Sequence, residues 1–172
     1  MELHTENEAY ASLLCGHLEG MIYRLRQMPE DKWDWRPADA SPTARILAAH
    51  AWQWLICDRQ HLEQPDASLH LPIPEPPSDP VAMCDALQVE TDHWRKLIMR
   101  CSADDFASPR KQFNLDEARM NVRSFVCHMI QNCIYKHGQL STLYFALGFD
   151  GTEPYSAPFP NPIYAEIFGE KF

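Results

Sequence analysis

The sequence lacks both the long apolar run of a membrane protein and the basic surface of a nucleic-acid-binding protein. No stretch approaches the roughly 18 consecutive apolar residues of a membrane-spanning helix. The first ten residues carry Glu2, Glu6 and Glu8 where a secretion signal carries positive charge. The 15 lysines and arginines are outnumbered by 24 acidic residues, and they form no basic cluster that would attract phosphates. We therefore expect a cytoplasmic protein that binds neither a membrane nor a nucleic acid.

Paired cysteines and the common catalytic motifs are also missing. The six cysteines form no CxxC pair and mostly occupy apolar helix positions, which is typical of reduced, buried thiols. The chain contains no P-loop, GxGxxG, HExxH or GxSxG motif, so the strong local signatures of nucleotide, zincin and hydrolase chemistry are excluded. A functional site must then be assembled from side chains of different helices.

Apolar residues recur at helical spacing in four segments of the chain. These segments predict helices at about Asn7 to Met28, Pro42 to Glu63, Pro80 to Cys101 and Met120 to Leu147. The expected caps are Ser41 for the second helix, Ser78 or Asp79 for the third, and Gly148 after the fourth. Ala103 to Glu117 reads as a loop. The length and even composition predict a single domain over residues 1–172.

Prolines dominate two connecting segments. Six of the fourteen prolines lie between Pro65 and Pro80, too many for a helix, so we expect an extended crossover there. Its sixteen residues can span on the order of 50 Å, enough for the helices on either side to lie parallel. The tail at residues 149–172 holds four more prolines and these apolar residues: Tyr155, Phe159, Tyr164, Ile167, Phe168 and Phe172. A second subunit would cover them in a homodimer, which we expect, or the tail would wrap its own helices.

Five polar side chains fall on or beside the apolar faces of the predicted helices, where they need partners. They are His50, Glu90, His128, Asn132 and Lys136. His50 stands in the middle of its apolar stripe, which makes it the best pocket candidate among the histidines. Glu90 is at the centre of the third helix's stripe, where its stem can reach solvent or its carboxylate can pair with Lys136 or a histidine. Together these residues predict a polar pocket between the helices.

Cys133 and His137 form the one Cys/His pair four residues apart on the fourth helix. Such a pair can bind zinc or act as thiolate and base. The helical wheel places the two across the middle and far flank of the apolar stripe, so we favour a buried thiol beside a hydrogen-bonded core histidine. His17 on the first helix has the same interpretation.

Two stretches resemble the DinB/YfiT-like superfamily. The run MPEDKWDWRPADASPTARILAAHAW resembles the family's proline turn, capping serine and second helix with its histidine. NCIYKHGQL resembles the fourth-helix segment, in which two histidines four apart are followed by one residue and then Gly-Gln. The resemblance implies an up-down-down-up four-helix bundle with a parallel middle pair, often a homodimer. It also implies a divalent metal held by three histidines, and activity as a thiol S-transferase, isomerase or hydrolase.

One of the family's three ligand positions keeps its histidine in this chain. His50 matches the second-helix ligand, whereas alignment on Gly138 and Gln139 places the other two at Asn132 and Lys136. Asparagine offers a weak carbonyl ligand, and a protonated lysine has no lone pair. We therefore expect a degenerate site in which zinc or nickel is weakly bound or absent.

Three alternatives follow for this site. The Lys136 ammonium can replace the metal with its own charge, with Asn132 and His50 as acceptors and Glu90 as counter-ion. His128 can supply a second imidazole and rescue a metal site. A register shifted by one residue would instead use Cys133 and His137 as ligands.

The resemblance leaves two hypotheses for function. The first is an enzyme descended from the metal-dependent thiol S-transferases or hydrolases, acting on a small-molecule or thiol substrate with His50 as the remaining base. The second is a non-catalytic protein of the same fold that binds a small molecule or another protein.

Overall fold

The computed structural model describes residues 5–64, 71–111 and 120–149. Most of this part of the chain is helical, so the all-α prediction is confirmed at that level. The helices are α1 (Glu6–Gln27), α2 (Ala44–Glu63), α3 (Pro80–Arg100), α4 (Ala103–Ala107) and α5 (Val122–Ala146), with a 3-10 turn at Glu30–Lys32. Two short strands, β1 (Pro109–Arg110) and β2 (Met120–Asn121), pair antiparallel. The first part of the crossover and the tail from residue 150 lie outside the described residues.

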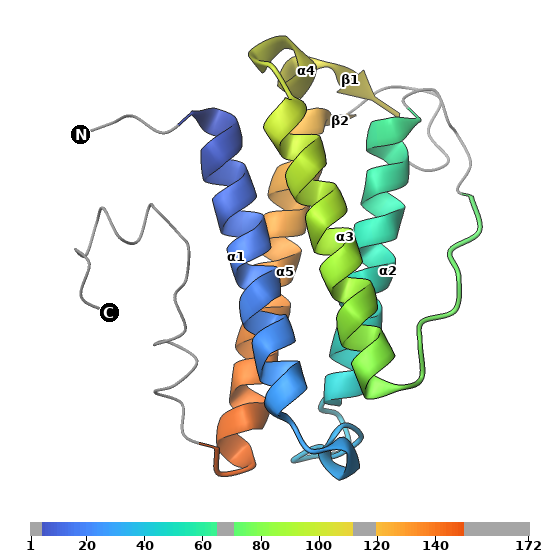
Figure 1. The fold of residues 1–172 in the computed structure, drawn as a ribbon, viewed down its shortest axis with the longest axis vertical. Coiled ribbons are helices and arrows are strands. Elements are labelled where there is room, and N and C mark those ends of the chain that lie inside the picture. The colour runs from blue at the N-terminus through green and yellow to red at the C-terminus, as the bar shows by residue number, and fades with distance from the viewer. Residues whose placement is uncertain (1–4, 65–70, 112–119, 150–172) are drawn as a thin grey trace, which may run out of the picture.

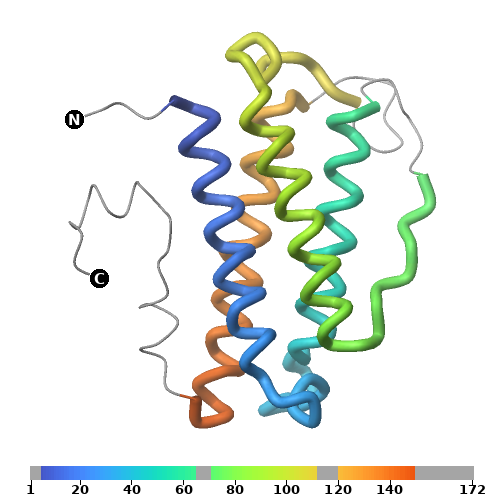
Figure 2. The backbone as a smooth tube through the Cα atoms, in the orientation of Figure 1, coloured from blue at the N-terminus to red at the C-terminus, as the bar shows by residue number. Residues whose placement is uncertain are grey.

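The four long helices lie side by side, with α1 and α5 running down the page and α2 and α3 running up (Figure 1). The main contacts of α1 are with α3 and α5, and those of α2 are with the same two helices. Residues 71–79 return along the molecule as extended chain to the start of α3 (Figure 2). The Leu71 N–H donates to the Gln60 side-chain oxygen at 3.1 Å, which fixes this segment to α2.

Side-chain caps determine where the helices begin. The prediction of Ser41 as the cap of α2 was wrong by two positions, because the Thr43 hydroxyl accepts the Ile46 N–H at 3.2 Å. Asp79 caps α3 by accepting the Ala82 N–H at 2.8 Å, as one of the two predicted alternatives. Gly148 follows the last residues of α5 with a φ of 82°, the left-handed conformation expected of a glycine at that position.

The loop predicted from Ala103 contains a short helix, α4, so this prediction was wrong for its first part. Ser102 and Asp105 form a capping box, in which each side chain accepts the other's backbone N–H, at 2.8 and 3.2 Å. Phe106 is 1% exposed and its ring meets Tyr10 at 5.5 Å. The reciprocal cap and the buried ring explain why a helix of one turn is stable here, although nothing in its apolar spacing predicts it.

The core lies between the four long helices. Its largest fully buried apolar side chains are Leu14, Leu18, Met21, Leu25, Trp33, Leu55, Met83, Leu87, Trp94, Ile98 and Phe106. The Trp94 indole N–H donates to the Leu55 carbonyl at 3.0 Å, so α3 is tied to α2 by a polar bond within this core. Of the described helices, none combines the length and the apolar character that crossing a membrane requires.

All six cysteines are free thiols, as predicted. Four are buried, namely Cys15, Cys57, Cys84 and Cys133. The expectation of burial was wrong for Cys127, which is exposed on the outer surface of α5. Its position is adjacent to the apolar stripe, but the neighbouring helices do not cover that side of α5.

Candidate functional site

Polar side chains face one another where α2 and α5 pack together. The two helices are antiparallel, and each contributes three residues spaced one turn apart. We call these six residues the α2–α5 site: His50, Trp54, Asp58, His128, Asn132 and Lys136. The spacing places Asp58 opposite His128 at one end of the site and His50 opposite Lys136 at the other.

Asp58 and His128 form a hydrogen-bonded pair. The Nδ1 atom of His128 lies 2.6 Å from Oδ2 of Asp58. The Asp58 side chain is 2% exposed, whereas that of His128 is 39% exposed, so the carboxylate is inside the protein and the imidazole reaches its surface. Burial raises the pKa of Asp58 from 3.8 to about 6, although the bond from His128 acts in the opposite direction.

Trp54 links the two histidines of the site. Its indole N–H donates to Nε2 of His50 at 2.6 Å, so this nitrogen carries no proton and the His50 imidazole is neutral. The same indole meets the His128 ring edge-on, with 5.5 Å between the ring centroids. Partial burial and the nearby Lys136 ammonium both lower the pKa of His50, which favours the neutral form further.

Lys136 is buried, with 3% of its surface exposed, and donates to the side-chain oxygen of Asn132. This contact is the one expected from the sequence. Among the described residues the ammonium contacts no carboxylate. Burial lowers the pKa of Lys136, and the neighbouring Cys133 thiol acts in the other direction. The site therefore contains a buried amine whose charge is not balanced by a carboxylate in the described part of the chain.

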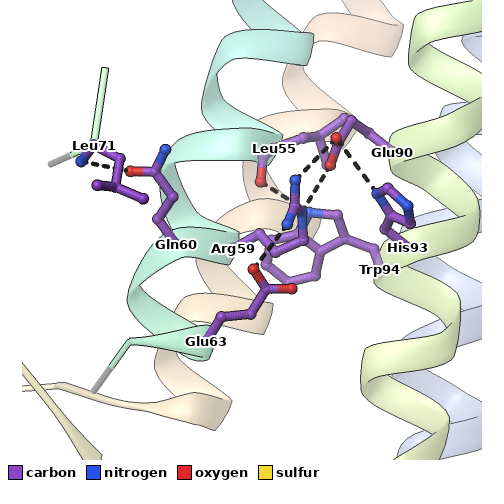
Figure 3. A network of polar contacts seen from close by, with 8 residues as sticks. All are labelled: Leu55, Arg59, Gln60, Glu63, Leu71, Glu90, His93 and Trp94. Carbon is purple, nitrogen blue, oxygen red and sulfur yellow. Dashed lines mark hydrogen bonds and ion pairs between the residues drawn. The ribbon is translucent and has the colours of Figure 1, made fainter. Parts of the chain in front are cut away.

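Glu90 does not serve as the counter-ion of Lys136, so that prediction was wrong. Glu90 is 6% exposed and accepts two bonds from the Arg59 guanidinium, at 2.9 and 3.0 Å. Figure 3 shows this pair between α2 and α3, with Glu63 and His93 beside it. A planar guanidinium matches both carboxylate oxygens, which a lysine ammonium cannot do.

His50 also differs from its prediction, since its side chain is exposed rather than in the middle of a buried stripe. The buried face of α2 is rotated toward Leu47, Ala51 and Leu55. Asp58 rather than His50 is the polar residue that this face buries most deeply. The apolar pattern alone could not determine which side of α2 faces the core, because small alanines share the buried face with the large side chains and blur its centre.

Cys133 is fully buried, and His137 contacts a histidine of α1. His137 Nδ1 lies 3.1 Å from His17 Nδ1, and both histidines are at least partly buried. Burial, together with the charges of Arg24 and His17, lowers the pKa of His137 to about 3, and burial raises that of Cys133 to about 12. Both shifts favour the neutral thiol and the neutral imidazole. Cys133 and His137 are 0% and 7% exposed, in agreement with the interpretation as core residues.

The residues at the positions that the resemblance assigns to metal ligands do not fit a metal ion. The His50 Nε2 lone pair accepts the Trp54 bond, and the Asn132 oxygen accepts the Lys136 ammonium. His50 and His128 each contact the Trp54 ring, at 6.1 and 5.5 Å, instead of each other. Within residues 5–64, 71–111 and 120–149, no three His, Cys, Asp or Glu side chains are grouped so that they could hold a metal. Weak or absent metal binding stays a prediction.

Asp58 and the polar role of Trp54 were not predicted from the sequence. A carboxylate within an amphipathic helix usually reaches water. From the sequence, Asp58 was therefore indistinguishable from an ordinary surface residue. One signal was present: Asp58 continues the one-turn spacing of His50 and Trp54, in the same way that Lys136 continues that of His128 and Asn132. Two such series on packed helices indicate a shared polar seam.

Comparison with protein-family models, with curated proteins and with solved structures finds no match to this chain. The resemblance to the DinB/YfiT-like superfamily thus depends on the two sequence stretches that carry it.

Proposed function

We propose that this chain is a DinB/YfiT-like protein whose α2–α5 site catalyses hydrolysis or thiol transfer on a small molecule without the family's metal ion. The observation that carries the proposal is the bond of 2.6 Å between the buried Asp58 and the surface-accessible His128. A carboxylate that orients a histidine is a recurring arrangement for a general base.

The arrangement of the helices supports the family assignment. α2 and α3 run in the same direction and are neighbours, and a proline-rich segment returns the chain between them. We propose on this basis that the fold is the up-down-down-up four-helix bundle of the superfamily. His50, Asn132 and Lys136, at the family's three ligand positions, lie within one site.

His128 has the geometry to move a proton. With Nδ1 held by the Asp58 carboxylate, Nε2 carries the free lone pair of a neutral imidazole. In the hydrolytic reaction, Nε2 takes a proton from water while the water oxygen bonds to the substrate's carbonyl carbon. The same proton then passes to the leaving group as its bond to that carbon breaks. In thiol transfer, Nε2 removes the thiol proton and the thiolate sulfur bonds to the electrophilic carbon. The leaving group then departs with the electron pair of its bond to that carbon, and Nε2 returns the proton to the leaving group or to water.

Lys136 supplies positive charge where the family places its cation. A thiolate or the oxyanion of a tetrahedral intermediate would be stabilised by an ammonium in a site of low dielectric. Asn132 orients this ammonium through its side-chain oxygen. An anion bound near Lys136 would in turn favour the protonated amine, against the effect of burial on its pKa.

Two probe reactions test this proposal: hydrolysis of p-nitrophenyl acetate, and transfer of glutathione to 1-chloro-2,4-dinitrobenzene. His128→Gln and Asp58→Asn should each lower the enzyme-catalysed rate by about 100-fold, the scale of lost general base catalysis. His93→Gln is the matched control, because His93 is a half-exposed histidine that contacts Glu90 outside the site. Equal rates for all three variants and the wild type would contradict the proposal.

The second candidate function is non-catalytic binding, favoured by a different observation. A depression of about 670 Å³ on the outer side of α5 borders His128 and Asn132 and has a largely apolar lining. Its remaining lining residues are Tyr10, Leu13, Cys127, Ile130, Gln131, Ile134 and Tyr135. A protein that binds a small molecule here would turn over neither probe, yet ligand would raise its melting temperature.

A further inference from the structure

The outer face of α5 is exposed but carries no charge. Between Ser124 and Phe149 the sequence contains no Asp, Glu or Arg, and its one lysine, Lys136, is buried. Charged residues make up 23% of the whole chain, so a stretch of this length without an exposed Asp, Glu, Lys or Arg is unusual for this protein. We call the exposed residues the uncharged α5 face: Cys127, Gln131, Ile134, Tyr135, Gly138, Thr142 and Phe145.

Large apolar groups on this face are open to solvent. Ile134, Tyr135 and Phe145 are 46%, 66% and 49% exposed. The upper part of the face forms the depression shared with Tyr10 of α1. In its middle, a Cβ added to Gly138 would meet nothing within 4 Å, so another chain can approach the backbone there. Contiguous exposed apolar surface of this kind marks a binding surface.

The end of α5 turns the chain back toward this helix. Gly148 adopts a φ of 82°, and the Phe149 N–H then donates to the Tyr144 carbonyl at 3.3 Å. The Phe149 ring packs against the Tyr144 ring, with 4.6 Å between the centroids. The last described residue is therefore already in contact with α5, and residues 150–172 follow directly from that point.

The sequence that follows matches the face in charge and length. Residues 154–165, PYSAPFPNPIYA, contain four prolines and three aromatic rings and no charged side chain. As extended chain these twelve residues would cover about 37 Å. The face from Phe145 to Cys127 is about 27 Å long at the rise of an α-helix. Proline-rich segments bind grooves lined with aromatic and apolar residues at a low cost in conformational entropy.

We propose that residues 154–165 dock on the uncharged α5 face of the same chain. The segment would cover Ile134, Tyr135 and Phe145 and would fill the depression between α1 and α5.

Cys127 provides a reporter for this contact, because it is the exposed thiol of the face and four other cysteines are buried. The experiment measures the reaction of Cys127 with Ellman's reagent in the full chain, with Cys101 replaced by serine to remove the half-buried thiol. Phe159→Asp places a charge in the docked segment and should accelerate labelling by about 10-fold, because it frees the face. Phe172→Asp is the matched control outside residues 154–165, and it should leave the rate unchanged.

Three results would overturn the proposal. Wild-type Cys127 could react as fast as it does in urea-unfolded chain, which would mean that the face is uncovered. Phe159→Asp and Phe172→Asp could have the same labelling rate. Protection of Cys127 could instead increase with protein concentration, together with a dimer in sedimentation equilibrium. That last result would make a second copy of the chain the occupant, as in the homodimer expected from the sequence.

Discussion

Asp58 and Glu90 are both buried carboxylates on the inner faces of neighbouring helices, yet their partners differ in kind. Glu90 accepts two bonds from Arg59, whose charge is permanent at any physiological pH. Asp58 accepts one bond from His128, whose imidazole can act as either a proton donor or a proton acceptor. The first pair is enclosed between α2 and α3, whereas the second reaches the surface through a half-exposed ring.

This difference distinguishes a structural pair, Arg59 and Glu90, from the pair that we propose to be functional, Asp58 and His128. A buried carboxylate with a bidentate arginine has its charge compensated within the fold. Such a pair has no proton to give to a ligand or to take from it. A buried carboxylate that holds a titratable, accessible imidazole places a proton acceptor at the surface, at a cost in stability. Four predictions test this comparison.

The largest effect on stability is expected from Glu90→Ala, which should lower the free energy of unfolding by about 4 kcal/mol because it leaves Arg59 partly buried without its main partner. Urea denaturation measures the change. The double variant Arg59→Met/Glu90→Leu serves as control and should lose much less, since it removes both charges together. A single variant that loses under 1 kcal/mol would mean that the pair contributes little.

Asp58→Asn should have the opposite effect on stability: it should raise the free energy of unfolding at pH 8 by roughly 2 kcal/mol. At that pH the buried carboxylate is ionised, whereas asparagine is neutral and its oxygen still accepts the His128 Nδ1–H. The gain should accompany the loss of activity proposed above. A destabilisation as large as that of Glu90→Ala would show that Asp58 is a structural residue like Glu90.

The pH dependence of the Asp58→Asn effect follows from the raised pKa of Asp58. Between the ordinary value of 3.8 and the folded value of about 6, the folded state binds more protons than the unfolded state. The contribution of Asp58 to stability is therefore full below about pH 4 and decreases as the pH rises through about 6. The gain in the free energy of unfolding that Asp58→Asn gives over the wild type should be near zero at pH 4 and constant above pH 7. Urea denaturation midpoints of both proteins across that pH range measure it.

A smaller gain, about 1 kcal/mol, is expected for Lys136→Met, because it replaces a buried ammonium that contacts no carboxylate in the described part of the chain. Lys136→Arg is the control that keeps the charge, and it should give no gain. A loss of about 3 kcal/mol or more for Lys136→Met would indicate that Lys136 compensates a buried anion after all. The geometry of Glu90 with Arg59 argues against that outcome.

The sequence was sufficient for those features that depend on spacing along one helix. The four long helices follow from apolar periodicity, and the contact between Lys136 and Asn132 follows from their separation of one turn. Features that depend on the rotation of one helix against another could not be predicted. Arg59 had to face α3 before it could pair with Glu90, and Asp58 had to face α5 before it could hold His128.

The position of Trp54 makes its fluorescence a signal of the state of the α2–α5 site. Its indole touches two imidazoles, His50 through a hydrogen bond and His128 through an edge-on ring contact. Protonated imidazole quenches indole fluorescence, whereas neutral imidazole quenches it much less. Emission from Trp54 should therefore follow the protonation of these histidines, and the difference between the spectra of the wild type and Trp54→Phe would isolate it from the other four tryptophans.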